Sequence, residues 1–373
     1  MNGNTHRFAW AEIDLGAYRR NIARLTTSGQ GEIWAVVKAD AYGHGAVECA
    51  RAALKAGATG LCVALVGEGE ELRLAGIAAP ILVMSEQPPE QLDDLVRLGL
   101  TATVYNTGSI DALARVASRA GLMTKVHLKV DTGMHRVGAA PADAVSRAQL
   151  IASHEWLELE GVYTHLATAD MPDRDSDSQR QVTKMVEVVR DLRGAGIALR
   201  HVHIGNSAAT LRRIGDSSLN TLHRVGIAAY GALDVDGVGG DLEPVMSLKA
   251  RVSHVQTVEA GEGVSYGLRR PLERRATVVT VPIGYADGVR RGWWEHGAVL
   301  IGGKRRSFAG VVTMDQVMVE CGDDLVRIAD EVVLIGSQGG ETIGVGEWAR
   351  ALGTISYEVL TGISPRVPRR YLR

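Results

Sequence analysis

A lysine and a tyrosine stand four residues apart in the stretch AVVKADAYGHGA, directly behind an apolar run. The run at 33–37 ends abruptly at Lys38, and Tyr42, two glycines and His44 follow. A lysine in this position is commonly a surface side chain whose alkyl stem covers apolar residues. Alternatively, its amine is desolvated, which makes it nucleophilic enough near neutral pH to bind a carbonyl group covalently. This stretch by itself favours the surface side chain.

Two later stretches have the residue types of a phosphate-binding site. They are IGNSAAT at 204–210 and RVGIAAYG at 224–231. Ser207 supplies a hydroxyl group at the start of a predicted helix, and Gly226 and Ile227 supply backbone N–H groups that a phosphate can approach. Pyridoxal 5'-phosphate (PLP) combines a phosphate with an aldehyde that reacts with lysine. The two stretches therefore favour the nucleophilic interpretation of the lysine, with PLP as the cofactor.

Eight strand-like runs alternate with alanine- and arginine-rich helical segments over the first two thirds of the chain. The runs are IWAVVK (33–38), GLCVAL (60–65), PILVM (80–84), TATVY (101–105), KVHLKVD (125–131), LEGVYTH (159–165), HVHIGN (201–206) and HRVGIAAYG (223–231). Such alternation predicts a parallel sheet, and eight units fit the size of a (β/α)8 TIM barrel. An open doubly wound sheet is the alternative, but its glycine-rich fingerprint is not found in usable form.

Polar residues gather where active sites of barrels are built. Lys38, His165, Asn206 and Ser207 all lie at or just beyond the C-terminal ends of predicted strands. In barrel enzymes this face carries the catalytic groups, whereas polar residues at the opposite face contribute to stability. The sequence therefore predicts a site at the C-terminal face.

Titratable side chains also occupy one whole face of several predicted strands. KVHLKVD carries His127, Lys129 and Asp131 on one face, and HVHIGN carries His201 and His203 on one face. A solvent-facing surface would explain this pattern for a single strand. In a closed barrel it does not, because helices cover the outer face of the sheet.

The character of the chain changes after about residue 238. Short β-like runs separated by glycine-rich turns follow, with little helix between them, which predicts a mostly antiparallel β domain. We therefore predict a PLP-binding barrel at 10–237 and a β domain at 238–373, which also includes residues 1–9. The stretch at 237–244 is the predicted linker, and the early run at 8–15 could be a strand of either domain.

Bulk properties exclude several classes of protein. A length of 373 residues suggests two domains, and a net charge of -2 gives no reason to expect nucleic acid or an anionic membrane as a partner. No apolar run approaches the length of a membrane span, and the start of the chain does not resemble a signal peptide. Cys49, Cys62 and Cys321 are too far apart for a disulfide framework or a metal site. We therefore expect a cytoplasmic protein without a bound metal.

A set of ordered motifs resembles the bacterial alanine racemases, which are PLP-dependent barrel enzymes. The motifs are AVVKADAYGHGA, VDTGMHRVG, THLATAD, HIGNSAA, VGIAAYG, VSYG, GYADG, TMDQ and ISYEV. Each is weak alone, but the ordered set is specific and extends from about residue 8 to the C-terminus. The resemblance implies a (β/α)8 barrel with a C-terminal β domain, a head-to-tail homodimer, and interconversion of L- and D-alanine for peptidoglycan synthesis.

The resemblance also implies a role for individual residues. Lys38 would hold PLP covalently and act as one base, and Tyr266 would be the second base in the active site of the other subunit. The cofactor would be bound by Lys38, Tyr42, His165, Asn206, Ser207, Arg224, Gly226, Ile227 and Tyr357. The substrate would meet Arg136, the Met314 backbone, Tyr285 and Asp315. Lys129 would be carbamylated, with an unmodified lysine paired with Asp131 as the alternative.

The chemistry of racemisation supports two bases, and Arg224 distinguishes a racemase from the related decarboxylases. Racemisation removes a proton from one face of a planar carbon and returns a proton to the other, so an amine and a phenol on opposite faces solve the geometry. Arg224 would face the pyridine nitrogen of PLP, and arginine keeps its proton. The related barrel decarboxylases have an acidic group there, which argues against that activity.

Two further alternatives remain. The first is a broader racemase that accepts serine, because Thr313 and Ser356 depart from the residues frequent in relatives and lie close to the expected substrate pocket. The second is a non-catalytic PLP carrier, which would consist of the barrel alone. A carrier needs no second base, so the long β domain with Tyr266 argues against it.

Overall fold

The computed structural model describes residues 7–373 except 29–30, 216–218, 234 and 236–237. The chain divides into two compact units. The barrel unit consists of residues 18–41 and 46–243, and the β unit consists of residues 1–17, 42–45 and 244–373. Two predicted regions lie partly outside the described residues: the linker, at its first residue 237, and the N-terminal segment, at residues 1–6.

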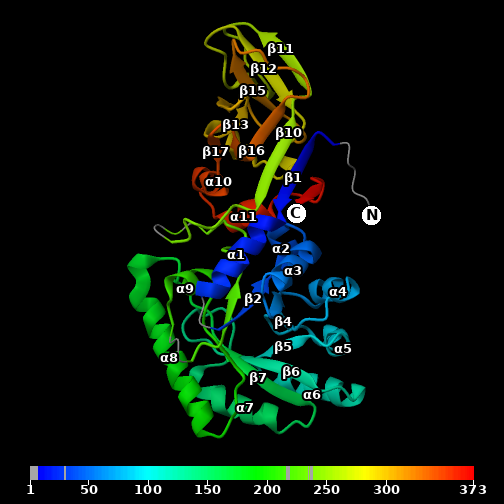
Figure 1. Ribbon diagram of the computed structural model, residues 1–373, viewed down its shortest axis with the longest axis vertical. Coiled ribbons are helices and arrows are strands. Elements are labelled where there is room, and N and C mark those ends of the chain that lie inside the picture. Colours follow the sequence, from blue (N-terminus) through cyan, green and yellow to red (C-terminus); the bar gives the residue numbers. More distant parts are fainter. Residues whose placement is uncertain (1–6, 29–30, 216–218, 234, 236–237) are drawn as a thin grey trace. The chain divides into compact units, whose positions relative to one another are not determined.

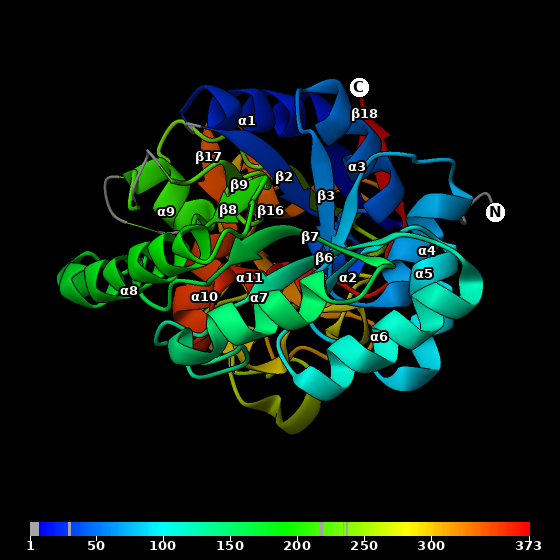
Figure 2. The ribbon, with the colours of Figure 1, turned by 90° about the horizontal axis from the view of Figure 1, so that it is seen from below.

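Eight parallel strands form the sheet of the barrel unit, as predicted (Figures 1 and 2). In chain order they are β2 (Glu32–Val36), β3 (Gly60–Val63), β4 (Ile81–Val83), β5 (Thr101–Val104), β6 (Thr124–Lys129), β7 (Leu157–Tyr163), β8 (His201–His203) and β9 (Leu222–Val225). From β2 to β8 each strand pairs with the next, and β9 pairs with β2. Thr221 N donates to Val202 O at 2.9 Å and Arg224 N donates to Gly205 O at 3.0 Å, so the seam between β8 and β9 is nearly closed.

Helices surround this ring of strands (Figure 2). They are α1 (Leu15–Ser28), α3 (Ala46–Lys55), α4 (Val66–Leu74), α5 (Leu92–Arg97), α6 (Thr107–Ala120), α7 (Ala144–Ala152), α8 (Asp175–Gly194) and α9 (Ser207–Arg212). The short segment α2 (Lys38–Gly43) follows β2 and is left-handed. Helix α6 illustrates the pattern, because it buries Ile110, Leu113, Ala114 and Ala117, which share one face at helical spacing. It ends at Gly121, whose φ of 64° suits the left-handed C-terminal position.

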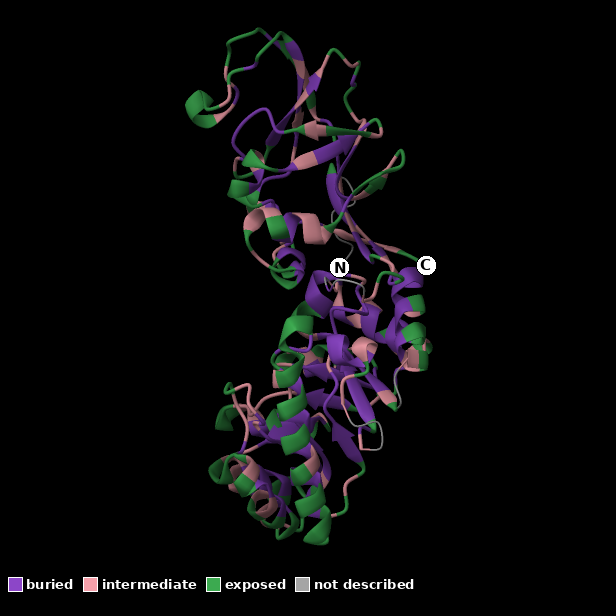
Figure 3. Ribbon diagram, turned by 90° about the vertical axis from the view of Figure 1, so that its left-hand side faces the viewer, coloured by how far each residue is buried: buried purple, intermediate pink, exposed green. Residues whose placement is uncertain are grey.

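The interior of the barrel is polar and aromatic rather than aliphatic. His127, Tyr163, His203 and Arg224 are all buried, although strand interiors of such barrels usually hold Val, Ile and Leu. The apolar alternate residues of the same strands are buried as well, so both faces of the sheet are covered (Figure 3). The titratable faces predicted from the sequence are therefore interior faces.

The β unit is mostly antiparallel. Its strands are β1 (Ala9–Asp14), β10 (Met246–Arg251), β11 (His254–Val258), β12 (Ala276–Val281), β13 (Ala298–Ile301), β14 (Lys304–Ser307), β15 (Val317–Gly322), β16 (Glu331–Gln338), β17 (Glu341–Ile343) and β18 (Arg369–Leu372), and its helices are α10 (Val345–Leu352) and α11 (Ser356–Thr361). One sheet has the order β14-β13-β16-β10-β1-β18 with β17 on β16, and another has the order β11-β12-β15. The early run at 8–15 thus belongs to the β unit, where β1 lies between β10 and β18.

Within the described ranges, no helix combines the length and the apolar character that a membrane crossing requires.

Close packing inside the barrel makes one glycine indispensable. Gly60 pairs with Trp34, and a Cβ atom at Gly60 would lie 2.5 Å from Cε2 of the buried Trp34 ring. We expect Gly60→Ala to destabilise the protein by about 1–3 kcal/mol through overpacking. Gly67→Ala is the matched control, because a Cβ there meets nothing within 4 Å, and it should stabilise α4 by about 0.5–1 kcal/mol. Thermal unfolding of both variants checks the opposite signs; equal melting temperatures would contradict the packing argument.

Candidate active site

Lys38 lies two residues beyond the C-terminal end of β2, at the start of a strained turn. Residues 39–42 all have positive φ, between 51° and 55°, which is unusual for four consecutive non-glycine residues. Three hydrogen bonds hold this left-handed turn: Ala39 N to Glu68 Oε1 at 2.7 Å, Ala41 N to Val37 O at 2.9 Å and Ala46 N to Asp40 Oδ1 at 2.7 Å. Such strain is typical of functional sites, where the surroundings over-determine the backbone.

Positive charge is concentrated around Lys38. Burial and the charge of Arg136 lower the pKa of Lys38. Burial, followed by Arg224 and Arg136, lowers the pKa of Lys129 to about 8. The Lys129 amine lies 5.4 Å from the centre of the Tyr163 ring, and it forms no ion pair with a carboxylate of the described residues. The geometry therefore provides amines that lose a proton readily and a site that attracts anions.

The loop after β6 is folded back by Asp131. One carboxylate oxygen of Asp131 accepts the backbone N–H groups of Gly133, Met134 and His135 at 2.9, 3.0 and 3.0 Å. Asp131 forms no ion pair with Lys129 in the described structure, so the simple pairing considered from the sequence is not found. Instead, Asp131 shapes the loop that carries the exposed Arg136.

The predicted phosphate-binding residues adjoin one another. Ser207 is buried at the start of α9, and its hydroxyl accepts the N–H groups of Gly226 at 2.9 Å and Ala228 at 3.3 Å. Asn206 caps α9 by accepting the N–H of Ala209 at 3.0 Å. Ile227 is buried directly after Gly226. The two stretches, far apart in sequence, therefore meet at the ends of β8 and β9.

Arg224 is held rigidly at the C-terminal half of β9. Its guanidinium donates to His203 Nδ1 at 2.6 Å, to His203 O at 3.0 Å and to Thr164 O at 2.7 Å. His165 Nδ1 lies 3.5 Å from the same group. Burial, together with Arg224 and Arg136, holds the pKa of His165 well below its ordinary value, so the imidazole is neutral.

In the β unit, four of the predicted site residues form two groups. Tyr42 and Tyr357 form the first group, with ring centres 5.9 Å apart. In the second group, Tyr285 N donates to Thr313 O and Ala286 N donates to Met314 O, both at 3.0 Å. Gly284 allows this approach, because a Cβ there would lie 2.3 Å from Thr313 O.

Other contacts in the β unit fix Asp315, Tyr266 and His44. Asp315 accepts from Arg366 at 2.7 Å. Tyr266 lies on the turn η4 (Tyr266–Leu268), which is anchored by Ser265 Oγ donating to Val311 O at 2.8 Å. The Tyr266 side chain is 75% exposed. His44 is buried, and its Nδ1 lies 3.0 Å from Tyr42 O.

Two residues that support the site were missed by sequence reasoning. Glu68 accepts N–H groups from Ala39 and Ala64, each at 2.7 Å, and so connects the turn after Lys38 to the end of β3. Gln181 of α8 bonds to Ala167 N at 2.9 Å and to His165 O at 3.0 Å. Both are ordinary helix residues by sequence, and only their spatial neighbours reveal the role.

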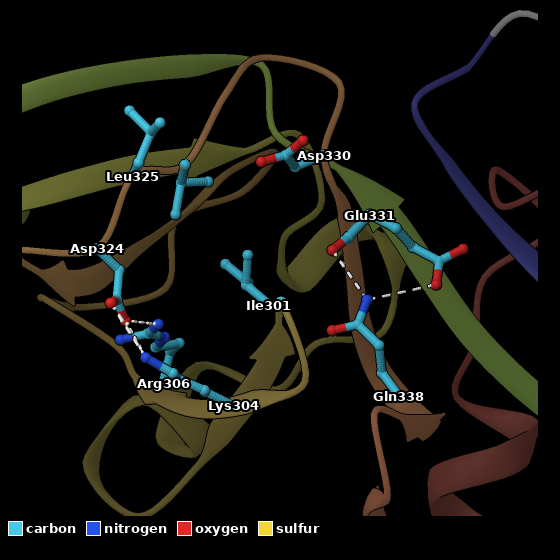
Figure 4. Close-up of a pocket in the computed structure, with 10 residues that line it drawn as sticks. Ile301, Lys304, Arg306, Asp324, Leu325, Asp330, Glu331 and Gln338 are labelled. Atoms are coloured by element: carbon cyan, nitrogen blue, oxygen red, sulfur yellow. Dashed lines mark hydrogen bonds and ion pairs between the residues drawn. The ribbon is translucent and has the colours of Figure 1, made fainter.

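A cavity of about 410 Å³ in the β unit involves none of the predicted site residues (Figure 4). Its wall carries Lys304 and Arg306, and both are paired with Asp324. Gln338 on the opposite side bonds to Glu331.

Comparison with known proteins agrees with this geometry. Residues 13–234 match the alanine racemase N-terminal domain family, and residues 245–371 match the alanine racemase C-terminal domain family. An alanine racemase from Symbiobacterium thermophilum is 44% identical over 98% of this chain and 97% of its own length. The crystal structure of alanine racemase from Streptomyces lavendulae superposes with a TM-score of 0.93 at 36% identity, covering 99% of this chain and 98% of that one. A histidine racemase from Leuconostoc mesenteroides superposes with a TM-score of 0.92 at 27% identity, covering 99% of both chains.

The lowered pKa of Lys129 predicts a pH dependence of stability. In the unfolded chain this lysine titrates near its ordinary value of 10.5, whereas in the folded protein its pKa is about 8. Between these values the unfolded state binds more protons, so stability rises as the pH is raised from 8 and is lost as it falls towards 8. The gain should be on the order of 3 kcal/mol, at about 1.4 kcal/mol per pKa unit.

Urea unfolding in carbonate-free buffer between pH ~8 and ~10 measures this gain. Lys129→Met should lose most of it, because methionine fills a similar volume without titrating. Lys184→Met, at an exposed position of α8, should behave like the unaltered protein. The same pH dependence in Lys129→Met and the unaltered protein would refute the assignment.

Proposed function

The chain belongs to the alanine racemase family, and we propose that it interconverts L- and D-alanine by a two-base mechanism with PLP as cofactor. The single observation that carries this proposal is the position of Lys38. Its amine lies at the C-terminal face of the barrel, with its pKa lowered by burial and by Arg136. A lowered pKa enlarges the fraction of neutral amine, which is the form that attaches to an aldehyde and accepts a proton.

The residues predicted to bind the cofactor fit the charges of PLP. When bound, PLP supplies an aldehyde for a lysine amine and a ring that draws electrons from the substrate Cα. Lys38 would hold the aldehyde carbon, and Ser207 with the backbone of Gly226 and Ile227 would hold the phosphate. Arg224 would face the pyridine nitrogen, where it donates a hydrogen bond but does not release a proton. Tyr42 and Tyr357 would add hydroxyl groups to the phosphate.

Two bases would divide the proton transfers. The Lys38 amine would take or return the proton on one face of the substrate Cα, and the Tyr266 phenol would act on the opposite face. Arg136 and the Met314 backbone would orient the substrate carboxylate, and Tyr285 and Asp315 would limit the entrance. His165 would pack against the cofactor ring.

A homodimer with shared active sites supplies the second base in this proposal. The turn that carries Tyr266 is exposed, with Tyr266 at 75% and Leu268 at 62%. Large apolar side chains gathered on an exposed turn are typical of interaction surfaces. A second copy of the chain is the occupant proposed for this surface, so that Tyr266 of each copy reaches the barrel of the other.

The substrate is proposed to be small, and the product D-alanine is proposed to serve peptidoglycan synthesis in the cytoplasm. A broader racemase that also accepts serine is the nearest alternative, because Thr313 stands beside the substrate-binding backbone. Similarity to a histidine racemase makes a larger side chain a distant alternative. Side-by-side rates for L-alanine, L-serine and L-histidine distinguish these substrates; a higher kcat/KM for serine or histidine would overturn the assignment to alanine.

Removing either base should impair racemisation severely. We expect Lys38→Ala to lose the activity and the covalently held cofactor, and Tyr266→Phe to lower kcat by about 10²–10⁴-fold. The loss in Tyr266→Phe should be unequal for the two enantiomers, with abstraction from L-alanine suffering most. Circular dichroism of the product, followed from each enantiomer, measures both effects. Full activity in Lys38→Ala would show that the central assignment is wrong.

Mixed dimers test the shared site directly. A heterodimer of Lys38→Ala and Tyr266→Phe chains contains one site with both defects and one site with both bases intact. Some activity should therefore return on mixing, up to about half of that of the unaltered dimer for one intact site. Heterodimers that form but stay inactive would argue against a second base from the partner.

Carbamylation of Lys129 would place an anion between Arg224 and Arg136. The neutral amine of Lys129 would attack CO₂, forming a nitrogen–carbon bond and releasing one proton to solvent. A pKa of about 8 makes the neutral amine available. Native mass spectrometry should find the added mass of one CO₂, absent from Lys129→Arg. A bare amine at full activity in bicarbonate buffer would rule out the modification.

A further inference from the structure

A continuous line of hydrogen-bonded side chains crosses the inside of the barrel. Arg224 Nη1 lies 2.6 Å from His203 Nδ1, His203 Nε2 lies 2.8 Å from His127 Nδ1, and His127 Nε2 lies 3.2 Å from Glu160 Oε2. The residues come from β9, β8, β6 and β7, and each is at most 4% exposed. Lys125, at 2.5 Å from Glu160 Oε1, follows at the other end and reaches solvent. The four buried side chains are called the interior relay: Arg224, His203, His127 and Glu160.

The two ends of the relay allow only one direction for its hydrogen bonds. A guanidinium donates and does not accept, so His203 Nδ1 must be the acceptor and Nε2 must carry the hydrogen. His127 Nδ1 then accepts from His203, and its Nε2 hydrogen points to Glu160. An ionised carboxylate only accepts, which agrees with this arrangement. The opposite direction would place two donors face to face at Arg224.

The protonation of each member is consistent with this direction. Burial lowers the pKa of His127, and burial with the charge of Arg224 holds that of His203 well below its ordinary value, so both rings are neutral. Burial acts to raise the pKa of Glu160, but hydrogen bonds from His127 and Lys125 outweigh it and lower the pKa to about 2. The carboxylate is therefore charged at all physiological pH values.

The buried positive charge of Arg224 gives a physical reason for the relay. Arg224 is a buried cation near Lys129 and Lys38, and no carboxylate of the described residues forms an ion pair with it. A buried charge without a paired anion is costly unless its hydrogen bonds are fully satisfied. Glu160 is the anion that the line of hydrogen bonds connects to Arg224, and each bond in the line polarises the next.

We propose that Glu160 and His127 are positioning residues, which act through His203 to fix the orientation of the Arg224 guanidinium at the C-terminal face of the barrel. This inference rests on the proposed function, in which Arg224 faces the pyridine nitrogen. Neither residue touches substrate or cofactor. Their contribution is to present His203 in the single tautomer that accepts from Arg224.

Neighbouring aromatic rings allow the effect of packing to be separated from the effect of the hydrogen bonds. Tyr163 stacks on His203 with ring centres 4.5 Å apart at 14°, so the ring plane of His203 is held without the relay. His201 is also buried on β8 and lies 5.8 Å from the His127 ring, but it forms no bond within the relay. A substitution of His201 therefore perturbs the same interior without breaking the line of hydrogen bonds.

The test combines nuclear magnetic resonance with matched variants. In the PLP-bound enzyme labelled with ¹⁵N-histidine, His203 and His127 should both be neutral with the hydrogen on Nε2. His127→Asn keeps an acceptor near the position of Nδ1 and should preserve the His203 signals. His127→Leu removes that acceptor; it should shift the His203 nitrogen signals and lower kcat roughly ten-fold or more at similar KM. His201→Leu should leave the His203 signals unchanged.

Each outcome decides the inference. A hydrogen on His203 Nδ1 in the unaltered enzyme would overturn the direction of the relay. Equal kcat and equal signals in His127→Leu and His127→Asn would overturn the positioning role. If His127→Leu does not fold, Glu160→Gln decides instead: unchanged histidine signals and kcat would refute the role of the charge. The tautomers are measured without substrate, so they test the relay alone. The Lys38→Ala assay tests the racemase assignment, and its failure would be a separate result.

Discussion

The Arg224 guanidinium is buried inside the barrel, no carboxylate among the described residues pairs with it, and much of the site is arranged around that charge. Its hydrogen bonds go to His203 and to the backbone of Thr164. Its field helps to lower the pKa values of Lys129 and His165. A cation that cannot lose its proton thus disfavours protonation of its neighbours and leaves the C-terminal face attractive to anions.

Besides the buried charge, backbone strain at the C-terminal face also costs free energy of folding. Four left-handed residues follow Lys38, at roughly 1–2 kcal/mol each for residues with a Cβ atom. Glu68 and Asp40 hold the turn through backbone N–H groups, and the packed barrel beneath offsets the strain. The turn directs the chain from Lys38, in the barrel unit, to Tyr42, in the β unit. The strain therefore lies directly after the lysine that is proposed to hold the cofactor.

Much of the fold could be predicted, because the signals were local. Alternating strand-like and helical runs predicted the eight parallel strands, and short runs with glycine turns predicted the antiparallel sheets. Short strands such as β14, β17 and β18 were not predicted, since three or four residues are too few to show a periodicity. The left-handed turn was also missed, because only Gly43 hints at positive φ and its neighbours are alanine, aspartate and tyrosine.

The sequence alone determined which chemical groups exist and roughly which strand end each one occupies. Ordered motifs identified the family, and strand-end positions indicated the face of the site. Only the tertiary structure decided which polar groups meet: that Asp131 binds backbone rather than Lys129, and that His203, His127 and Glu160 form one line behind Arg224. The physical reason is that hydrogen bonds join residues on different strands, up to 76 positions apart, and their direction depends on both ends of the line at once.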